Sequence, residues 1–181
     1  MLPMTVVGLM FKFMLSPTNG VINDILMNLH LVKAPVEWLL NEKTVIWGLI
    51  IANTWVGIPF NMLLLSTGLD NVPQDVYKSA SIDGANSVQR FFYITVPMIK
   101  QSILSVLILG FVYTFKVFDL VYVTTGGGPV DASEVLSTYS YRLSFKTYYF
   151  GQGAAVANVL FLCLFVVALV YLKLIGKDEV S

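Results

Sequence analysis

The sequence carries little charge. Of its 181 residues, 11 are Lys or Arg and 11 are Asp or Glu, which makes 12% charged residues and a net charge of zero. An ordinary soluble domain has about 25% charged residues. A neutral chain lacks the basic footprint with which proteins hold nucleic acid. Because 56% of the residues are apolar, a disordered chain is also excluded. The composition leaves an unusual core or a membrane protein.

Cysteine and histidine are almost absent. The one cysteine, Cys163, lies inside an apolar run, which excludes a disulfide framework and a zinc ribbon. The one histidine, His30, has no cysteine or second histidine nearby, so we expect no metal site and no cofactor. The apolar runs hold no His, Asp or Glu in their central portions, which leaves an intramembrane enzyme without a nucleophile–base pair or metal ligands. We therefore expect that the chain is not an enzyme.

Long runs without charge are what the sequence does contain. Residues 44–69 and 151–172 carry none, and residues 95–115 carry only Lys100. A hydrocarbon core about 30 Å thick requires about 20 helical residues, so each run is long enough to cross it. The short apolar stretch at the start of the chain is typical of the second half of a helix. We predict an all-α, polytopic transmembrane helix bundle over 1–181, with spans near 1–14, 44–69, 96–116 and 151–172 and a loop at 70–95.

The loop at 70–95 is too polar to span and too apolar to be only a linker. Pro73 and Asp75 favour a helix start, and Gly84 is typical of the residue that follows a helix. Asn86 with Gln89 three residues later predicts the cap of a second short helix. Two interpretations stay open: a helix pair resting on lipid headgroups, or a docking element for a soluble partner.

The same loop carries a family signature. The string YKSASIDGANSVQRFFYITVPMI, residues 77–99, resembles the EAA signature of permeases of binding-protein-dependent ABC importers. Three positions depart from the usual pattern: Lys78 replaces glutamate, Ser79 replaces alanine and Val96 replaces leucine. The strings TWVGIPFNMLLLSTGLDNVP, FKVFDLVYVTTGGGP and GQGAAVANVL are similar to the sugar-type, maltose-like permeases. The resemblance covers essentially the whole chain, and it implies that N-terminal spans of the family are missing before Met1.

The resemblance supplies an orientation that Lys/Arg counting leaves undecided, since five such residues lie on one predicted side and six on the other. In this family the signature loop faces the cytoplasm and sits in a groove of the ATPase subunit. Residues 16–43 and 116–150 would then lie outside, and the tail after Leu172 inside. The residues implied for this coupling loop are Tyr77, Lys78, Ser79, Ala80, Ile82, Asp83, Gly84 and Ala85.

A solute route needs polar groups and interrupted helices at membrane depth. Pro59 lies inside the run 44–69 and predicts a kink with freed backbone groups. Rings, amides and hydroxyls on either side suit a sugar, which exposes C–H faces and hydroxyl edges. The predicted substrate pathway, based partly on the resemblance, comprises Gly57, Phe60, Asn61, Gly110, Tyr113, Thr114 and Val117. The alternative for Trp55, Phe60 and Tyr113 is packing between helices or an interfacial belt.

The resemblance thus implies an inner-membrane permease subunit of an ATP-driven importer. It would carry a sugar or related solute delivered by an external binding protein. Its partners would be a second permease subunit, two ATP-binding cassette ATPase subunits, an extracytoplasmic solute-binding protein, the solute and the lipid bilayer, without nucleic acid. No GxxxxGK[ST] sequence is present, so ATP hydrolysis would belong to the separate subunit. Two alternatives stay open: a permease for a polyol or glycerol phosphate, and a non-transporting structural membrane protein.

Overall fold

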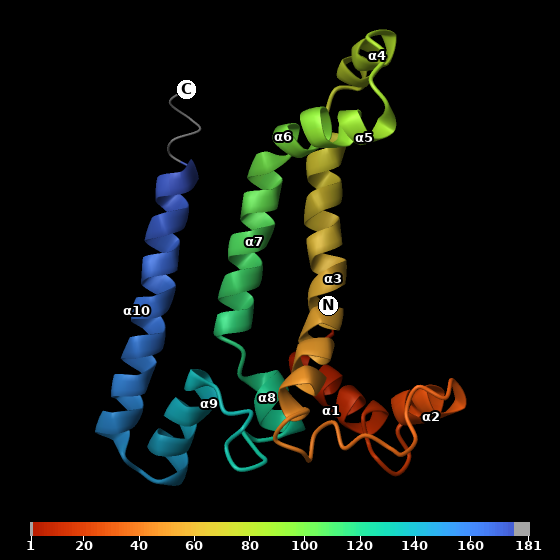
Figure 1. Cartoon of the computed structure of the whole chain (residues 1–181). Coiled ribbons are helices and arrows are strands. Elements are labelled where there is room, and N and C mark those ends of the chain that lie inside the picture. The colour runs from red at the N-terminus through yellow and green to blue at the C-terminus, as the bar shows by residue number, and fades with distance from the viewer. Residues whose placement is uncertain (1, 176–181) are drawn as a thin grey trace. The chain divides into compact units, whose positions relative to one another are not determined.

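The computed structural model describes residues 2–175, and these fold into helices joined by turns, with no strand among them (Figure 1). Met1, and the end of the tail predicted to lie inside, fall outside the described residues. The chain divides into two compact units. Unit 1 comprises Met1–Val56 and Thr114–Phe165, and unit 2 comprises Gly57–Tyr113 and Val166–Ser181. Each of the two long helices, α3 (Val45–Asp70) and α10 (Phe150–Ile175), has residues in both units.

Unit 1 is built around the packing of helix α1 (Met4–Met14) on helix α8 (Asp119–Thr124). Gly8 permits the close approach, since a Cβ there would lie 3.1 Å from the hydroxyl oxygen of Thr124. The core cluster consists of Val7, Phe11, Leu15, Ala52 and Leu120. Unit 1 also contains α2 (Val21–Asn28), α9 (Leu136–Tyr141) and the π-helix η2 (Arg142–Lys146). Helix α1 therefore packs on residues far along the chain, since Thr124 lies 116 positions after Gly8.

One buried amide organises the segment between α1 and α3. Asn23 is 1% exposed. Its Nδ2 donates to the carbonyl oxygens of Ser16 and Val36, at 3.2 and 3.0 Å. Its Oδ1 accepts from the backbone N–H of Val36 and from Nε1 of Trp38, each at 3.1 Å. Because buried backbone groups need partners, this side chain substitutes for regular structure across the segment.

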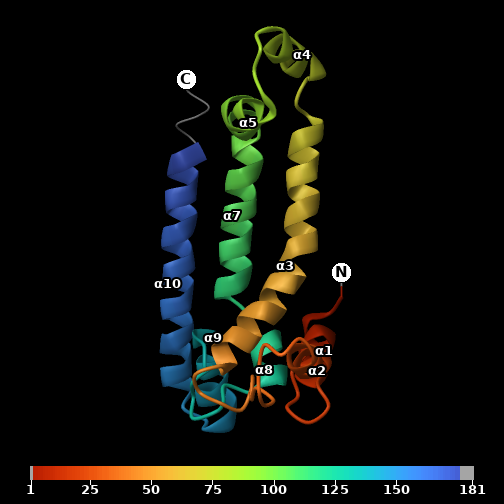
Figure 2. The ribbon, with the colours of Figure 1, turned by 45° about the vertical axis from the view of Figure 1, so that its right-hand side comes forward.

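Unit 2 consists of the second part of α3, the loop helices and most of α7 (Lys100–Phe115), with the end of α10. The loop 70–95 holds α4 (Gln74–Ile82), α5 (Ser87–Arg90) and the π-helix η1 (Phe91–Thr95), and α6 (Val96–Met98) follows it. Figures 1 and 2 show α4 and α5 at the ends of α3 and α7. A Cβ on Gly68 would lie only 2.4 Å from Oγ of Ser102, so glycine lets these two helices touch.

Two helices are long and apolar enough to cross a membrane, Val45–Asp70 and Phe150–Lys173. The span predicted near 96–116 corresponds to α6 and α7. The chain bends by 69° between Ser87–Met98 and Lys100–Phe115, so this range adds a third candidate span if the bent pair counts as one. Pro97 lies in the first turn of α6, and a proline cannot donate to the helical ladder, so a break here is physically reasonable. Helix α3 continues through Pro59 without interruption.

Candidate functional site

The loop between α3 and α7 turns on a glycine with positive φ. Helix α4 ends at its C-cap Asp83, and Gly84 follows with φ +80°. The N–H of Gly84 donates to the carbonyl of Ser81 at 3.2 Å, and the N–H of Ala85 donates to that of Ala80 at 2.9 Å. These two bonds form the Schellman motif, which satisfies carbonyls at a helix end and favours glycine. The predicted role of Gly84 in ending the helix is confirmed.

Helix α5 is closed at its start by the predicted cap. The side chain of Asn86 accepts from the N–H of Gln89 at 2.9 Å, and the side chain of Gln89 accepts from the N–H of Asn86 at 2.9 Å. This reciprocal pair is a capping box. Arg90 then reaches back from the end of α5 and donates to the hydroxyl of Ser81 at 2.9 Å. The two short helices are therefore tied together by polar contacts between near neighbours.

The first helix of the loop, α4, is also anchored to η1 at the end of the loop. The hydroxyl of Tyr77 shares a hydrogen bond of 2.9 Å with the hydroxyl of Thr95, which is 8% exposed. Lys78, which replaces the glutamate usual in the family, pairs with Asp75 at 2.8 Å on an exposed surface. Such exposed pairs contribute only about 0–1 kcal/mol. Tyr77 therefore anchors α4 to η1, whereas Lys78 contributes little to the stability of the loop.

Several apolar side chains of the loop have no cover within the chain. Ile82 is 87% exposed and Tyr93 80% exposed, and Val88 and Phe92 are also exposed. Tyr93 also lines a hollow of about 330 Å³ at the glycine turn. The hollow is lined by Asp83, Gly84, Ala85, Gln89, Tyr93 and Ile94. A rigid element that leaves apolar surface exposed is suited to contact a partner.

Two of the predicted pathway residues meet in unit 2. The rings of Phe60 on α3 and Tyr113 on α7 lie edge to face, with centroids 6.1 Å apart and planes at 89°. Gly57 leaves room toward Asn61, whose Nδ2 would lie 3.7 Å from a Cβ. A Cβ on Gly110 would meet nothing within 4 Å. The predicted pathway residues of α3 and α7 therefore contact each other at this aromatic pair.

The remaining pathway residues belong to unit 1. Nδ2 of Asn53 donates to the hydroxyl of Thr114 at 3.2 Å, which couples two polar side chains of apolar helices. Val117 is half-buried against the core cluster, and its carbonyl accepts from the hydroxyl of Ser137. Trp55 packs on Phe11 with ring centroids 5.9 Å apart. The packing interpretation of Trp55 is thus supported, whereas Thr114 keeps a polar contact that a solute hydroxyl could replace.

Sequence reasoning missed a charged cluster in the segment 116–150. Arg142 pairs with Asp131 at 2.7 Å and with Glu134, and its guanidinium lies 5.4 Å from the ring centre of Tyr139. Burial raises the pKa of Glu134, and the charge of Arg142 acts in the opposite direction. The hydrogen bond to Asp131 raises the pKa of Arg142. Glu134 and Asp131 lie 8 and 11 residues before Arg142, so no short-range sequence pattern predicts these ion pairs.

Metal-binding side chains form no cluster in the part of the chain that the structure describes. Among residues 2–175, no group of three or more His, Cys, Asp or Glu side chains is placed to hold a metal ion. The site is therefore one of rings, amides, hydroxyls and helix ends, which can bind and guide a solute or a partner.

The sequence was compared with known families and proteins. The family described as "Binding-protein-dependent transport system inner membrane component" matches residues 1–177. The chain is 33% identical over 178 residues to the probable ABC transporter permease protein YurN of Bacillus subtilis, covering 97% of this chain and 61% of that protein. It is 36% identical over 167 residues to the trehalose/maltose transport system permease protein MalF of Thermococcus litoralis, covering 90% and 54%.

Solved structures share the fold. A bacterial ABC transporter involved in the import of the acidic polysaccharide alginate matches with a TM-score of 0.80 and 23% identity, over 98% of this chain and 61% of that one. A bacterial alginate ABC transporter in complex with an alginate pentasaccharide-bound periplasmic protein matches with a TM-score of 0.82 and 24% identity, over 94% and 59%. The chain spans about three fifths of the length of these proteins.

Proposed function

Because this chain belongs to the family of inner membrane components of binding-protein-dependent transport systems, we propose that it is a permease subunit of an ATP-driven importer. It forms part of the route by which a sugar or related solute crosses the inner membrane. The match over residues 1–177 carries this proposal. The names of relatives that handle trehalose/maltose and sulfoquinovosyl glycerol support a carbohydrate-like solute.

The loop 70–95 is the element that receives energy from the ATPase subunit. Two short helices are held rigid by the Schellman motif at Gly84 and the capping box of Asn86, while Ile82 stays exposed. A rigid element can transmit a displacement, since a flexible loop would absorb it. The loop residues proposed for this contact are Tyr77, Lys78, Ser79, Ala80, Ile82, Asp83, Gly84 and Ala85. The loop then faces the cytoplasm, and residues 16–43 and 116–150 face outward.

The solute passes residues of α3 and α7. Phe60 and Tyr113 offer ring faces and a phenolic hydroxyl, and Asn61 and Thr114 offer an amide and a hydroxyl. An aromatic face with hydrogen-bonding groups at its edge suits the alternation of C–H faces and hydroxyls on a sugar. Gly57, Gly110 and Val117 complete the proposed pathway, with Val117 contributing only the part of its surface that the core cluster leaves open.

The importer also requires partners. A second permease subunit completes the pathway, two ATP-binding cassette ATPase subunits hydrolyse ATP, and an extracytoplasmic solute-binding protein delivers the solute. One structural neighbour was solved in complex with an alginate pentasaccharide-bound periplasmic protein. This complex supports delivery of the solute by a separate binding protein.

Reconstitution tests the proposal. The permease is expressed with a second permease subunit, an ATPase and a solute-binding protein from the same source, purified as a complex and placed in proteoliposomes that contain ATP. We expect uptake of at least one radiolabelled carbohydrate from a panel of neutral sugars, polyols, uronates and sugar phosphates, and no uptake without ATP.

A matched control uses an ATPase with its catalytic glutamate replaced by glutamine. Uptake that persists with this ATPase, or an ATPase that fails to co-purify with the permease, would refute the proposal.

A further inference from the structure

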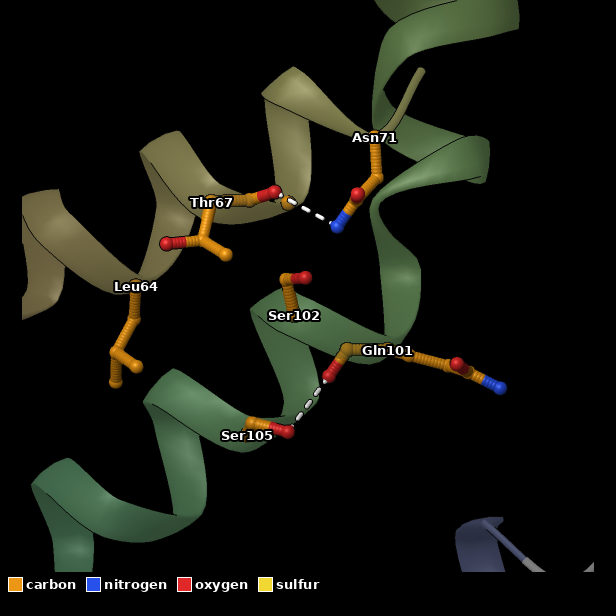
Figure 3. A pocket seen from close by; sticks show the side chains of 7 residues that line it. Leu64, Thr67, Asn71, Gln101, Ser102 and Ser105 are labelled. Atoms are coloured by element: carbon orange, nitrogen blue, oxygen red, sulfur yellow. Dashed lines mark hydrogen bonds between the residues drawn. The ribbon is translucent and has the colours of Figure 1, made fainter. Parts of the chain in front are cut away.

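Unit 2 contains a pocket that none of the predicted site residues lines. It occupies about 330 Å³ between the last turns of α3 and the first turns of α7. Figure 3 shows Leu64, Thr67 and Asn71 on the α3 side pointing toward α7. Ser102 points back toward α3. Gly68 lines the pocket as well, and its lack of a Cβ lets the two helices approach at Ser102. Because the loop 70–95 joins these same helix ends, the pocket lies beside that loop.

The lining is polar without being charged. Its lining residues include Thr67, Ser102 and Ser105, which carry hydroxyls, and Asn71, which carries an amide. Gln101 also lines the pocket, but Figure 3 shows its side chain directed away from α3. Lys100 and Asp70 are adjacent in the sequence to two of these residues, but neither lines the pocket. Hydroxyls and amides both donate and accept hydrogen bonds, so they suit a ligand that does the same. An anionic ligand would need a cation in such a partly enclosed place.

The polar groups are partly committed to the walls. Nδ2 of Asn71 donates to the carbonyl of Thr67 at 2.9 Å, and Oγ of Ser105 donates to the carbonyl of Gln101 at 2.9 Å. Ser105 also lies 3.4 Å from the hydroxyl of Tyr171 on α10. These contacts fix the lining, while Oδ1 of Asn71 and the lone pairs of the serine hydroxyls remain able to accept. The pocket is therefore preformed.

The pocket is in line with the aromatic pair of the proposed pathway. On α3, Thr67 follows Phe60 by seven residues, which is two helical turns on the same face, about 10 Å further along. On α7, Ser102 precedes Tyr113 by 11 residues, or three turns on the same face, about 16 Å. The two faces that meet at the Phe60–Tyr113 pair thus meet again at the pocket.

We infer that this pocket is a second binding site for the solute. The solute occupies it after leaving the Phe60–Tyr113 pair and before it is released beside the loop 70–95. The inference rests on the proposed transport function and adds a substrate class to it. The solute is a neutral polyhydroxyl compound, either a sugar or a polyol. An acidic solute, such as the alginate named for the structural neighbour, would find no cation in this lining.

Thiol labelling tests the pocket directly. In the assembled transporter, with Cys163→Ser as background, Thr67→Cys places a thiol in the pocket and Ser66→Cys places one on the same helix, one residue away, outside the lining. Each variant is treated with a neutral glucosyl methanethiosulfonate and with the anionic sulfonatoethyl methanethiosulfonate. The rate ratio of the two reagents at Ser66→Cys corrects for their intrinsic reactivity.

We expect the neutral-to-anionic rate ratio to be about 10-fold higher at Thr67→Cys than at Ser66→Cys, the size of effect that one or two net hydrogen bonds produce. Adding Asn71→Leu to Thr67→Cys should return the ratio toward the control. Equal ratios at the two positions, or a preference for the sulfonate at Thr67→Cys, would overturn the inference. A ratio that stays high with Asn71→Leu would also overturn it.

The same proteoliposomes separate this inference from the proposed function. Normal ATP-dependent uptake with equal labelling ratios would support the importer function and refute only the inference about the pocket. Uptake restricted to anionic solutes removes the neutral substrate class. Absence of all ATP-dependent uptake refutes the proposed function, on which the inference rests.

Discussion

Replacing Gly84 tests whether the rigidity of the loop 70–95 is what couples the permease to the ATPase. Gly84 has φ +80°, and a Cβ there would meet no atom within 4 Å. A substitution therefore introduces no clash inside the chain, and its effect in the isolated chain is confined to backbone strain. Valine is β-branched and disfavours this region strongly, whereas asparagine tolerates it. The position thus separates strain from size.

The strain can be given a magnitude. An L-residue with a side chain in the left-handed region costs about 1–2 kcal/mol. Relief of this strain would break the hydrogen bonds that Gly84 and Ala85 donate to Ser81 and Ala80. A change of this size alters the ratio of two conformations by about 5–30-fold. We expect Gly84→Val to lower coupled uptake by a factor in that range, Gly84→Ala to lower it less, and Gly84→Asn to lower it least.

The assay measures ATP hydrolysis and solute uptake together in proteoliposomes, with the membrane level of each variant checked by immunoblot. Uncoupling is seen as continued ATP hydrolysis with reduced uptake. If Gly84→Asn were as damaging as Gly84→Val, the loss would follow side-chain size and reflect contact with the ATPase surface. If Gly84→Val kept full uptake at normal membrane level, the coupling role of the turn would be refuted.

Three further predictions use other parts of the chain. In a cysteine-free background, Ser79→Cys should react with an impermeant maleimide only in inside-out vesicles and Val130→Cys, at an 84% exposed position, only in intact cells; labelling of both in intact cells would contradict the orientation. Phe60→Ala with Thr114→Ala should reduce uptake through loss of a ring face worth about 0.5–1.5 kcal/mol and a hydroxyl partner, without changing solute affinity of the separate binding protein; unchanged uptake rate and solute preference would assign both residues to packing. Burial raises the pKa of Glu134, so its contribution to stability falls as pH rises through the acid range up to that raised pKa. Glu134→Gln should remove this slope in thermal unfolding of the purified protein, and an identical slope would exclude Glu134 as its source.

The loop helices could be predicted from the sequence because their ends depend on neighbouring residues. Gly84 needs only the preceding turn of helix to act as a C-terminal stop, and Asn86 needs only Gln89. Such contacts span three to five residues, so they leave a pattern that can be read along the chain. The same is true of the apolar runs that became α3 and α10.

Contacts between distant residues left no such pattern. The carbonyl of Ser16 lies seven residues from Asn23, and Nε1 of Trp38 lies 15 residues from it. Asparagine in an exposed-looking segment gives no sign that it will be buried. The break at Ile99 was also missed, because Pro97 is compatible with a helix start as well as with a bend. A proline therefore does not by itself predict a break, since α3 continues through Pro59.

The two kinds of contact stabilise the molecule in different ways, and the difference bears on coupling. The segment that holds Asn23 depends on one buried amide, so its parts cannot separate without leaving polar groups unpaired. The loop around Gly84 is instead fixed by short-range bonds that remain intact wherever the loop moves. It can thus shift as a unit with α3 and α7 while Ile82 and Tyr93 stay exposed for a partner. An element that keeps its own shape and leaves its apolar surface free is what transmission of a stroke from an ATPase requires.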